Sequence, residues 1–247
     1  MKRMIVITGA NHGIGLALTK SLLGMGDCIA ALDLETDNLD RTHPDLLPFR
    51  CDVTQPKQIQ TAVDEVVAKW GKVDILINNA CLALFLPFEE RSLDDIRSEF
   101  EVNYFGYLNM IRAVLPIMKK QGHGVIHNFS SGVGYTGTPN MTGYTSTKGA
   151  IESLTRTLAL EYASQGIVFN VMHPPLTRTQ SSSGLGIPPE MMADPEVVGH
   201  KLAKQVGKTS PVLTADLSNE FQLWCSYHFR VQMGKLLMRL TERAQKH

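Results

Sequence analysis

Cysteine is scarce in this chain of 247 residues, which contains four, and they lie far apart: Cys28, Cys51, Cys81 and Cys225. No two of them form a CxxC pair, and no set of cysteines and histidines has the spacing of a zinc site. We therefore expect reduced thiols, as in a cytoplasmic protein, and no bound metal.

An excess of charge of either sign is also missing. Lys and Arg together number 24, and so do Asp and Glu, so the sequence favours neither a nucleic-acid partner nor a membrane surface. No run approaches the roughly 18 apolar residues of a membrane span, and the N-terminal apolar stretch "MIVI" is too short for a signal peptide. We expect a soluble, cytoplasmic protein without a membrane span.

Apolar residues are plentiful, at 43% of the chain, and short β-branched runs alternate with helical patterns. Strands are predicted at 4–8, 28–33, 46–50, 73–78, 124–130, 166–172 and 210–215. Helices are predicted near 14–25, 56–70, 93–121, 143–164 and 194–207. This alternation predicts a single domain, 1–247, with a doubly wound Rossmann fold: a parallel sheet of about seven strands flanked by helices.

Two features mark the last third of the chain. The segment 173–195 is rich in Pro, Ser and Gly, which predicts a mobile substrate loop. A C-terminal helix is predicted over 219–243 with Ser218 as its N-cap. One face of that helix would carry Phe221, Trp224, Tyr227, Val231 and Leu237. We expect this face to pack on its own domain or on a second subunit; the alternative is a helix on a membrane surface.

A glycine-rich loop, "TGANHGIG", follows the first predicted strand and begins a helix. Its glycines permit a tight turn and a close approach to a pyrophosphate, and the helix N-terminus supplies N–H donors. The strand–loop–helix setting makes this pattern more specific than the glycines alone. The loop residues predicted to bind a dinucleotide are Gly9, Asn11, His12, Gly13, Ile14 and Gly15.

Acidic and amide residues follow the next strands. Asp33 ends the second strand, where a carboxylate accepts hydrogen bonds from the adenosine ribose and repels a 2′-phosphate, so NAD is favoured over NADP. Asp52 and Val53 after the third strand, and Asn79 and Ala80 after the fourth, are predicted to line the nucleotide site. The alternative for each polar residue is ordinary turn chemistry, since Asp and Asn are favoured in turns.

Four polar residues form a candidate catalytic set. Tyr144 and Lys148 lie one helical turn apart, and the ammonium is expected to lower the pKa of the phenol from about 10. The Ser131 hydroxyl can hold a substrate oxygen while the tyrosine gives or takes a proton. Asn103 lies within the long predicted helix. Taken singly, each also fits a solvated helix face, a strand-end cap or a buried helix residue.

The ordered set "TGANHGIG", Asp33, "NNA", Asn103, "SSG" and "YTSTK" resembles the short-chain dehydrogenase/reductase family from Met4 to about Thr179. The resemblance implies that Tyr144 is the catalytic acid/base and that Lys148 binds the nicotinamide ribose. It implies that Ser131, rather than Ser130, positions the substrate oxygen. It also implies that Asn103 bends its helix to hold a water in a proton relay.

Three departures from the family pattern stand out. Cys81 replaces a usual glycine, and Pro174-Pro175 replaces a usual Pro-Gly beside the nicotinamide. Thr179 keeps the family's position for binding the carboxamide or phosphate. The glycine-rich C-terminal ending of the family is replaced by the aromatic segment 219–243.

The expected function is an NAD-dependent oxidoreductase that interconverts a secondary alcohol and a ketone. The substrate pocket is predicted to be lined by Leu82, Val133, Tyr135, Met141, Leu176 and the loop 181–192, which suits an apolar or mixed substrate. By resemblance we expect a homodimer or homotetramer that pairs through helices 93–121 and 143–164. The alternatives are a non-catalytic NAD(H)-binding sensor or scaffold, and an NADPH-dependent 3-oxoacyl-carrier-protein reductase.

Overall fold

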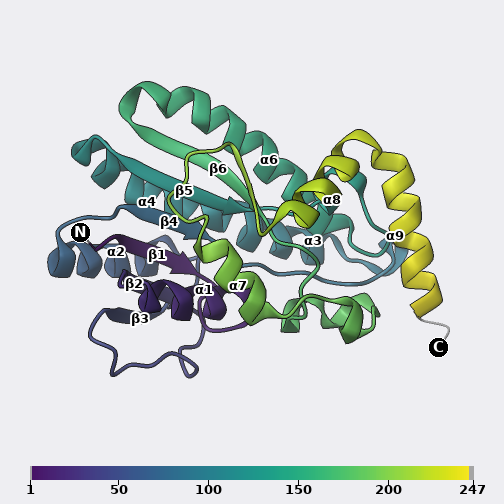
Figure 1. The fold of residues 1–247 in the computed structure, drawn as a ribbon, viewed down its shortest axis with the longest axis horizontal. Coiled ribbons are helices and arrows are strands. Elements are labelled where there is room, and N and C mark those ends of the chain that lie inside the picture. Colours follow the sequence, from purple (N-terminus) through teal and green to yellow (C-terminus); the bar gives the residue numbers. More distant parts are fainter. Residues whose placement is uncertain (1, 245–247) are drawn as a thin grey trace.

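The computed structural model describes residues 2–244 and, within its helices, side chains as far as 239. The described chain forms one sheet of seven parallel strands in the order β3-β2-β1-β4-β5-β6-β7 (Figure 1). The strands are β1 Met4–Thr8, β2 Cys28–Asp33, β3 Leu46–Arg50, β4 Ile75–Asn78, β5 Gly124–Phe129, β6 Ile167–His173 and β7 Val212–Thr214. The predicted doubly wound single domain is confirmed.

Helices connect these strands and cover both faces of the sheet. They are α1 Gly13–Gly24, α2 Pro56–Trp70, α3 Leu93–Phe100, α4 Gly106–Gln121, α5 Val133–Thr136, α6 Thr142–Tyr162, α7 Pro195–Ala203, α8 Leu217–His228 and α9 Arg230–Ala244. Short 3₁₀ turns occur at Phe88–Glu90, Ala163–Gln165, Gln180–Leu185 and Pro189–Met191. None of the described helices is long and apolar enough to cross a bilayer.

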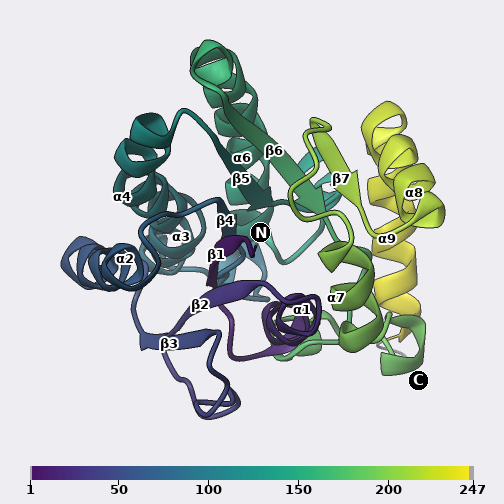
Figure 2. The same ribbon diagram turned by 60° about the vertical axis from the view of Figure 1, so that its left-hand side comes forward.

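Two apolar cores lie on opposite faces of the sheet because strand side chains alternate in direction. Ile5 and Ile7 of β1 point toward α1 and α7, whereas Val6 points toward α2 and α4. Figure 2 shows α1 and α7 on one side of the sheet and α2, α4 and α6 on the other. The strand ends between these layers are therefore held rigidly, and the loops that follow them form the candidate site.

The predicted helix 93–121 is not continuous. A π-helical turn, Glu101–Phe105, separates α3 from α4 and carries Asn103 at its centre. The predicted fourth strand also starts late, at Ile75, and the Asp74 carboxylate before it accepts a hydrogen bond from the backbone N–H of Met4. The other predicted strands and helices agree with the structure to within a few residues.

The predicted single helix 219–243 is wrong in two respects. The chain bends at Phe229 (φ −118°, ψ 48°), which divides it into α8 and α9, and the N-cap is Asp216 rather than Ser218. Beyond the bend, Gly234 of α9 lies against the carbonyl of Thr136, so the turn lets α9 pack on α5. In Figure 1 this pair of helices, drawn in yellow, lies at one end of the molecule.

The aromatic face expected to pack on its own domain is instead largely exposed, although the Tyr227 ring packs edge-on against Tyr135 of α5. Phe221 is 65% exposed, Trp224 48%, Tyr227 50% and Val231 64%, whereas Leu237 lines a cavity. The buried residues of α8 are polar, Asn219 and Ser226, so its inward face is the hydrophilic one. Packing of the aromatic face on a second subunit stays a prediction.

Candidate active site

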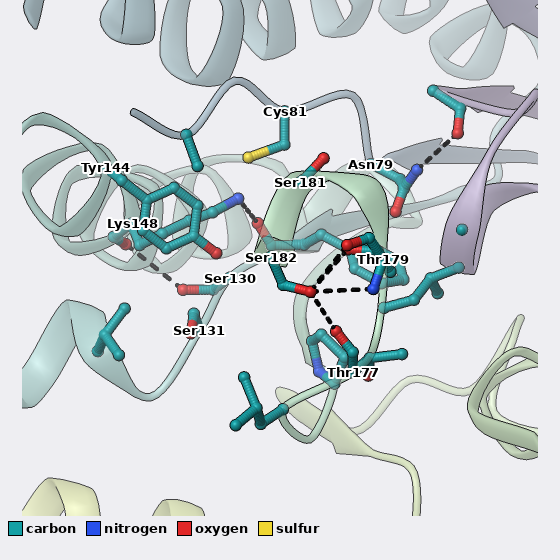
Figure 3. A pocket seen from close by; sticks show the side chains of 18 of the residues that line it. Asn79, Cys81, Ser130, Ser131, Tyr144, Lys148, Thr177, Thr179, Ser181 and Ser182 are labelled. Carbon is teal, nitrogen blue, oxygen red and sulfur yellow. Dashed lines mark hydrogen bonds between the residues drawn. The ribbon is translucent and has the colours of Figure 1, made fainter. Parts of the chain in front are cut away.

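A cavity of about 810 Å³ runs along the carboxyl ends of the strands. Most of the predicted site residues line it, namely Gly9, His12, Gly13, Ile14, Gly15, Asp33, Asp52, Val53, Asn79, Ala80, Ser131, Tyr144, Lys148, Pro174 and Thr179. Figure 3 shows Tyr144, Lys148, Ser130 and Ser131 at one end of this view, with Asn79 and Thr179 at the other. Asn11 and Asn103 lie behind the cavity wall, both fully buried.

The glycine loop forms a cradle that side chains in place of its glycines would fill. A Cβ on Gly15 would lie 1.9 Å from the carbonyl oxygen of Gly9, and a Cβ on Gly9 would lie 2.9 Å from Cα of Ala80. The Asn79 amide donates to the carbonyls of Thr8 and Gly9, each at 3.0 Å, and so fixes the loop to the end of β4. The open N-terminus of α1 faces the same cavity, as pyrophosphate binding requires.

One carboxylate oxygen of Asp33 already accepts a hydrogen bond from the glycine loop. Its Oδ2 accepts the backbone N–H of Asn11 at 2.8 Å, and the carboxylate lines the cavity. The Asn11 side chain turns away, and its Oδ1 accepts the backbone N–H of Asn38 at 2.9 Å. Asn11 therefore shapes the loop from behind, while Asp33 has the position expected of a ribose-binding carboxylate.

Asp52 has the turn-capping role considered for it, and its binding of a nucleotide stays a prediction. Its Oδ1 accepts the backbone N–H and the hydroxyl of Thr54, which caps the turn after β3, and the residue also lines the cavity. Val53 packs against Gly106, where an added Cβ would lie 2.7 Å from the valine methyl. The start of α4 is therefore held close to the part of the cavity that Val53 lines.

The catalytic set comes together around one point. Lys148 is buried, and its Nζ donates to the carbonyl of Phe129 at 3.0 Å while lying 5.4 Å from the centre of the Tyr144 ring. The Ser131 hydroxyl acts on the Tyr144 phenol and lowers its pKa. Ser130 is buried, and its hydroxyl approaches the carbonyl of Lys148 at 3.4 Å. Of the two serines, Ser131 is the one beside the phenol.

The ionisation of Tyr144 differs from the sequence prediction. Burial of the phenol raises its pKa well above the ordinary value of 10, and Ser131 lowers it only in part. The predicted net lowering is wrong for this structure, because desolvation of the phenolate, with Cys81 and Glu99 nearby, raises the pKa by more than Ser131 lowers it. Burial also lowers the pKa of Lys148. The phenol is therefore held in its protonated, proton-donating form.

Asn103 acts on the backbone around the set. Its side chain accepts the N–H of Leu82 at 2.7 Å and donates to the Leu82 carbonyl at 2.8 Å. It also donates to the Thr147 hydroxyl on α6 at 3.2 Å. Asn103 thus fastens the loop after β4 to the helix that carries Tyr144 and Lys148, and the π-helical turn gives it this reach.

Comparison with known proteins agrees with this arrangement. The family model for short chain dehydrogenase matches residues 3–186, which is most of the chain. The chain belongs to the short-chain dehydrogenase family. Among curated relatives of that family, 2-(R)-hydroxypropyl-CoM dehydrogenase of Xanthobacter autotrophicus is 31% identical over 226 residues, covering 87% of this chain and 90% of that protein.

Solved structures of short-chain dehydrogenases superpose well. The 3-ketoacyl-(acyl-carrier-protein) reductase of Brucella melitensis, complexed with NADH, is 25% identical with a TM-score of 0.77, covering 86% of this chain and 96% of that one. A short chain dehydrogenase of Burkholderia cenocepacia, in complex with NADP, has a TM-score of 0.82 at 24% identity, covering 96% and 97%. Because one of these structures holds NADH and the other NADP, the similarities do not distinguish between the two cofactors.

The loop 173–195 of this short-chain dehydrogenase lies over the glycine-loop end of the cavity. The Thr179 methyl lies 2.9 Å from the position of a Cβ on Gly13, so it covers the glycine loop directly. Ser182 accepts the backbone N–H of Thr179 at 2.9 Å and donates to the carbonyl of Thr177 at 2.8 Å, which ties the loop to itself. The predicted mobility of this loop stays a prediction.

The predicted substrate wall is partly right. Val133, Met141 and Leu176 line the cavity, as do members of the 181–192 loop, Ser181, Ser182, Leu185, Ile187 and Met191. Tyr135 and Leu82 are absent from the lining, and this part of the prediction is wrong. The Tyr135 hydroxyl instead donates to Glu152 at 2.5 Å, while both backbone polar groups of Leu82 bind Asn103.

Sequence reasoning missed the wall formed by the C-terminal helices. The inward face of α8 contributes Asn219, Gln222, Leu223 and Ser226, and α9 contributes Met233, Leu236 and Leu237. The α8 residues recur at helical spacing, a signal that was present in the sequence. The aromatic stripe on the opposite side of α8 carries a stronger apolar pattern, and it misled the prediction of the buried face.

Proposed function

We propose that this short-chain dehydrogenase is an NAD-dependent oxidoreductase that interconverts a secondary alcohol and a ketone. The observation that carries the proposal is the grouping of Ser131, Tyr144 and Lys148 on the same cavity as the glycine cradle and Asp33. A nicotinamide cofactor bound in this cavity would supply or accept the hydride.

The roles of the side chains follow from their chemistry. Ser131, beside the phenol, is suited to hold the substrate oxygen. Tyr144 carries the proton that this oxygen takes up when a ketone is reduced, and burial keeps that proton on the phenol. The positive charge of Lys148 stabilises the phenolate left behind. Asn103 holds the loop and helix that frame these groups.

The preference for NAD over NADP rests on Asp33. Its carboxylate faces the cavity at the end of β2, where it can accept hydrogen bonds from ribose hydroxyls and would repel a 2′-phosphate. The competing observation is Arg50, an exposed cation that pairs in register with Asp33 on the next strand. Charge-assisted hydrogen bonds of this kind contribute about 1.5–3 kcal/mol, so a preference of about tenfold or more is expected.

Binding of the two cofactors tests this preference directly. Wild-type protein should bind NADH at least about tenfold more tightly than NADPH, and Asp33→Ser should lose most of that difference. His200→Gln, an exposed change remote from the cavity lining, is the matched control and should leave both affinities unaltered. Tighter binding of NADPH by the wild-type protein would contradict the proposal.

The substrate that fits best is a neutral, mixed carbonyl compound. Charged side chains line the cavity only at Asp33, Asp52 and Lys148 within residues 2–239, where the side chains are described. The remaining wall combines apolar side chains with the neutral polar groups of Asn219, Gln222 and Ser226. An ionised substrate tail would therefore be desolvated without a counter-charge.

A carbonyl panel tests the substrate class. NADH oxidation should be fastest with neutral ketones that carry a hydroxyl or amide several atoms from the carbonyl. Keto acids of the same size should react at least about a hundredfold more slowly, since burying an unpaired charge costs several kcal/mol. Preference for a 3-oxoacyl carrier protein would instead favour the reductase alternative suggested by the Brucella melitensis relative.

We also propose a cytoplasmic homodimer or homotetramer that pairs through the surfaces of α4 and α6. Two large apolar side chains are exposed there, Leu160 at 83% on α6 and Phe105 at 45% just before α4. Light scattering after gel filtration measures the assembly. Leu160→Glu should shift an oligomer toward monomer, and a monomeric wild-type protein would contradict the proposal.

A further inference from the structure

Glu152 lies one helical turn beyond Lys148 on α6, so Tyr144, Lys148 and Glu152 follow one another along the same face. Only 3% of Glu152 is exposed. A buried carboxylate is costly unless other groups compensate its charge, so its surroundings indicate its role.

Three segments contribute groups to this carboxylate. The Tyr135 hydroxyl on α5 donates to Oε2 at 2.5 Å, and Nε2 of His173 at the end of β6 lies 2.8 Å from Oε1. Arg156 on α6 approaches Oε2 at 3.5 Å, and Ser130 at the end of β5 acts to lower the pKa of the carboxyl group. Burial acts to raise the pKa of Glu152, but His173, Ser130 and Tyr135 outweigh it and hold the pKa below the ordinary value.

Each of these segments also carries a member of the proposed active site. Ser131 follows Ser130, and Pro174 follows His173 at the end of β6. The Tyr135 ring stacks on the imidazole of His173, with ring centres 5.9 Å apart, and so joins two of the segments a second time. Glu152 is the point at which α6, the end of β5 with α5, and the end of β6 meet.

The Lys148 ammonium needs a negative neighbour. It is 2% exposed, donates to the Phe129 carbonyl, and lies 5.6 Å from the centre of the Tyr107 ring. Burial lowers its pKa, whereas Cys81 and Glu152 act in the opposite direction. Because burial also raises the pKa of the Cys81 thiol, that group is neutral near pH 7. Glu152 is then the ionised partner of the two.

We propose that Glu152 is a positioning residue of this active site, whose carboxylate keeps the Lys148 ammonium charged and joins the three segments that carry the catalytic groups. The proposal rests on the proposed function of Tyr144 and Lys148 as an acid–base pair. It adds a residue that touches neither substrate nor cofactor and acts through Lys148.

Several titratable groups surround the pair and must be separated from it. Around Lys148 these are Tyr144, Tyr107 and Cys81, with Glu99 of α3 acting on Tyr144. Around Glu152 they are Tyr135, His173 and Arg156, and Tyr227 of α8 packs on Tyr135. In ketone reduction both Tyr144 and Lys148 must hold their protons, so the alkaline limb of the pH profile reports on them.

The test is the pH dependence of kcat/KM for NADH-driven ketone reduction in Glu152→Gln. Loss of the negative charge should move the alkaline limb to lower pH by about one unit, since a nearby opposite charge shifts a pKa by roughly one to three units. Glu152→Asp, which keeps the charge, should return the alkaline limb most of the way to its wild-type pH. A purely structural role would lower the rate without moving the limb.

Asp27→Asn is the matched control. Asp27 is another buried carboxylate in an ion pair, with Arg3, and it is absent from the cavity lining. Its loss should reduce stability and leave the limb unmoved. If the pH profile of Glu152→Gln superposes on the wild-type profile, the proposal is overturned. If Tyr144→Phe retains full activity, the proposed function fails instead, and the two failures are distinguishable.

If Glu152→Gln does not fold, Arg156→Gln provides a second test. The Arg156 side chain is 65% exposed, so its loss is tolerable, and its removal takes a cation away from the same carboxylate. The limb should then move to higher pH by about a few tenths of a unit, a small effect because the group is screened by solvent. A limb that stays in place or moves to lower pH overturns the proposal.

Discussion

His127 should make this protein sensitive to mild acid. The residue lies in β5 and is fully buried. Its Nδ1–H donates to Oδ1 of Asn170, and its Nε2 accepts the backbone N–H of Gly207 at 2.9 Å. Both bonds require the neutral imidazole with its proton on Nδ1. A second proton on Nε2 would meet the Gly207 N–H instead of a lone pair.

The size of the effect follows from the pKa. Burial lowers the pKa of His127 from 6.5 to about 4, although the hydrogen bond to Asn170 opposes the change. The unfolded chain therefore binds the proton first as the pH falls. The contribution of neutral His127 to the free energy of unfolding is fully present above about pH 6.5. It declines as the pH falls to about 4, by roughly 3 kcal/mol at 1.36 kcal/mol per pH unit.

Urea unfolding at a series of pH values measures this loss. His127→Gln is the informative variant, because an amide can supply the same donor and acceptor without titrating. Between pH 7 and pH 4 it should lose about 3 kcal/mol less than the wild type, whereas His200→Gln, at an exposed site, should follow the wild type. Parallel profiles for His127→Gln and the wild type would refute the reasoning.

Two further predictions concern the cradle and a buried ion pair. Gly15→Ala should weaken NADH binding by about tenfold or more without unfolding the protein, because its Cβ would meet the Gly9 carbonyl at 1.9 Å; fluorescence titration measures it, and unchanged affinity would contradict the cradle. Arg91→Met should cost about 3–5 kcal/mol in urea unfolding, because it leaves the fully buried Glu99 carboxylate without its cation; a loss below about 1 kcal/mol would show that Glu99 is otherwise compensated.

The parts of the fold that depend on local sequence were predictable. Strands β1, β2 and β3 and helix α2 match their predicted bounds, because buried apolar runs lie between clear turn signals. The sequence has no glycine or proline at the bend at Phe229 that would predict it. The bend depends on Arg230, which stacks on the Tyr227 ring and donates to its carbonyl, and on the packing of α9 against α5.

In the candidate site, too, the local motifs were predictable and the long-range contacts were not. The glycine loop and the Tyr144–Lys148 pair are local motifs, and the structure brings both to one cavity. The pKa of Tyr144 was predicted with the wrong sign, since the sequence reveals the neighbouring lysine but not the depth of burial. Glu152 and His173 are 21 positions apart, and only the alignment of α6 beside β6 brings them together.

The central claim is that Tyr144 supplies the proton in a hydride-transfer reaction. The direct measurement is single-turnover oxidation of bound NADH by a neutral ketone in Tyr144→Phe, with NADH affinity measured on the same protein. Loss of one general acid should slow turnover by about a hundredfold to ten-thousandfold while NADH binds within about twofold of the wild type. Turnover at the wild-type rate with full NADH binding would contradict the account.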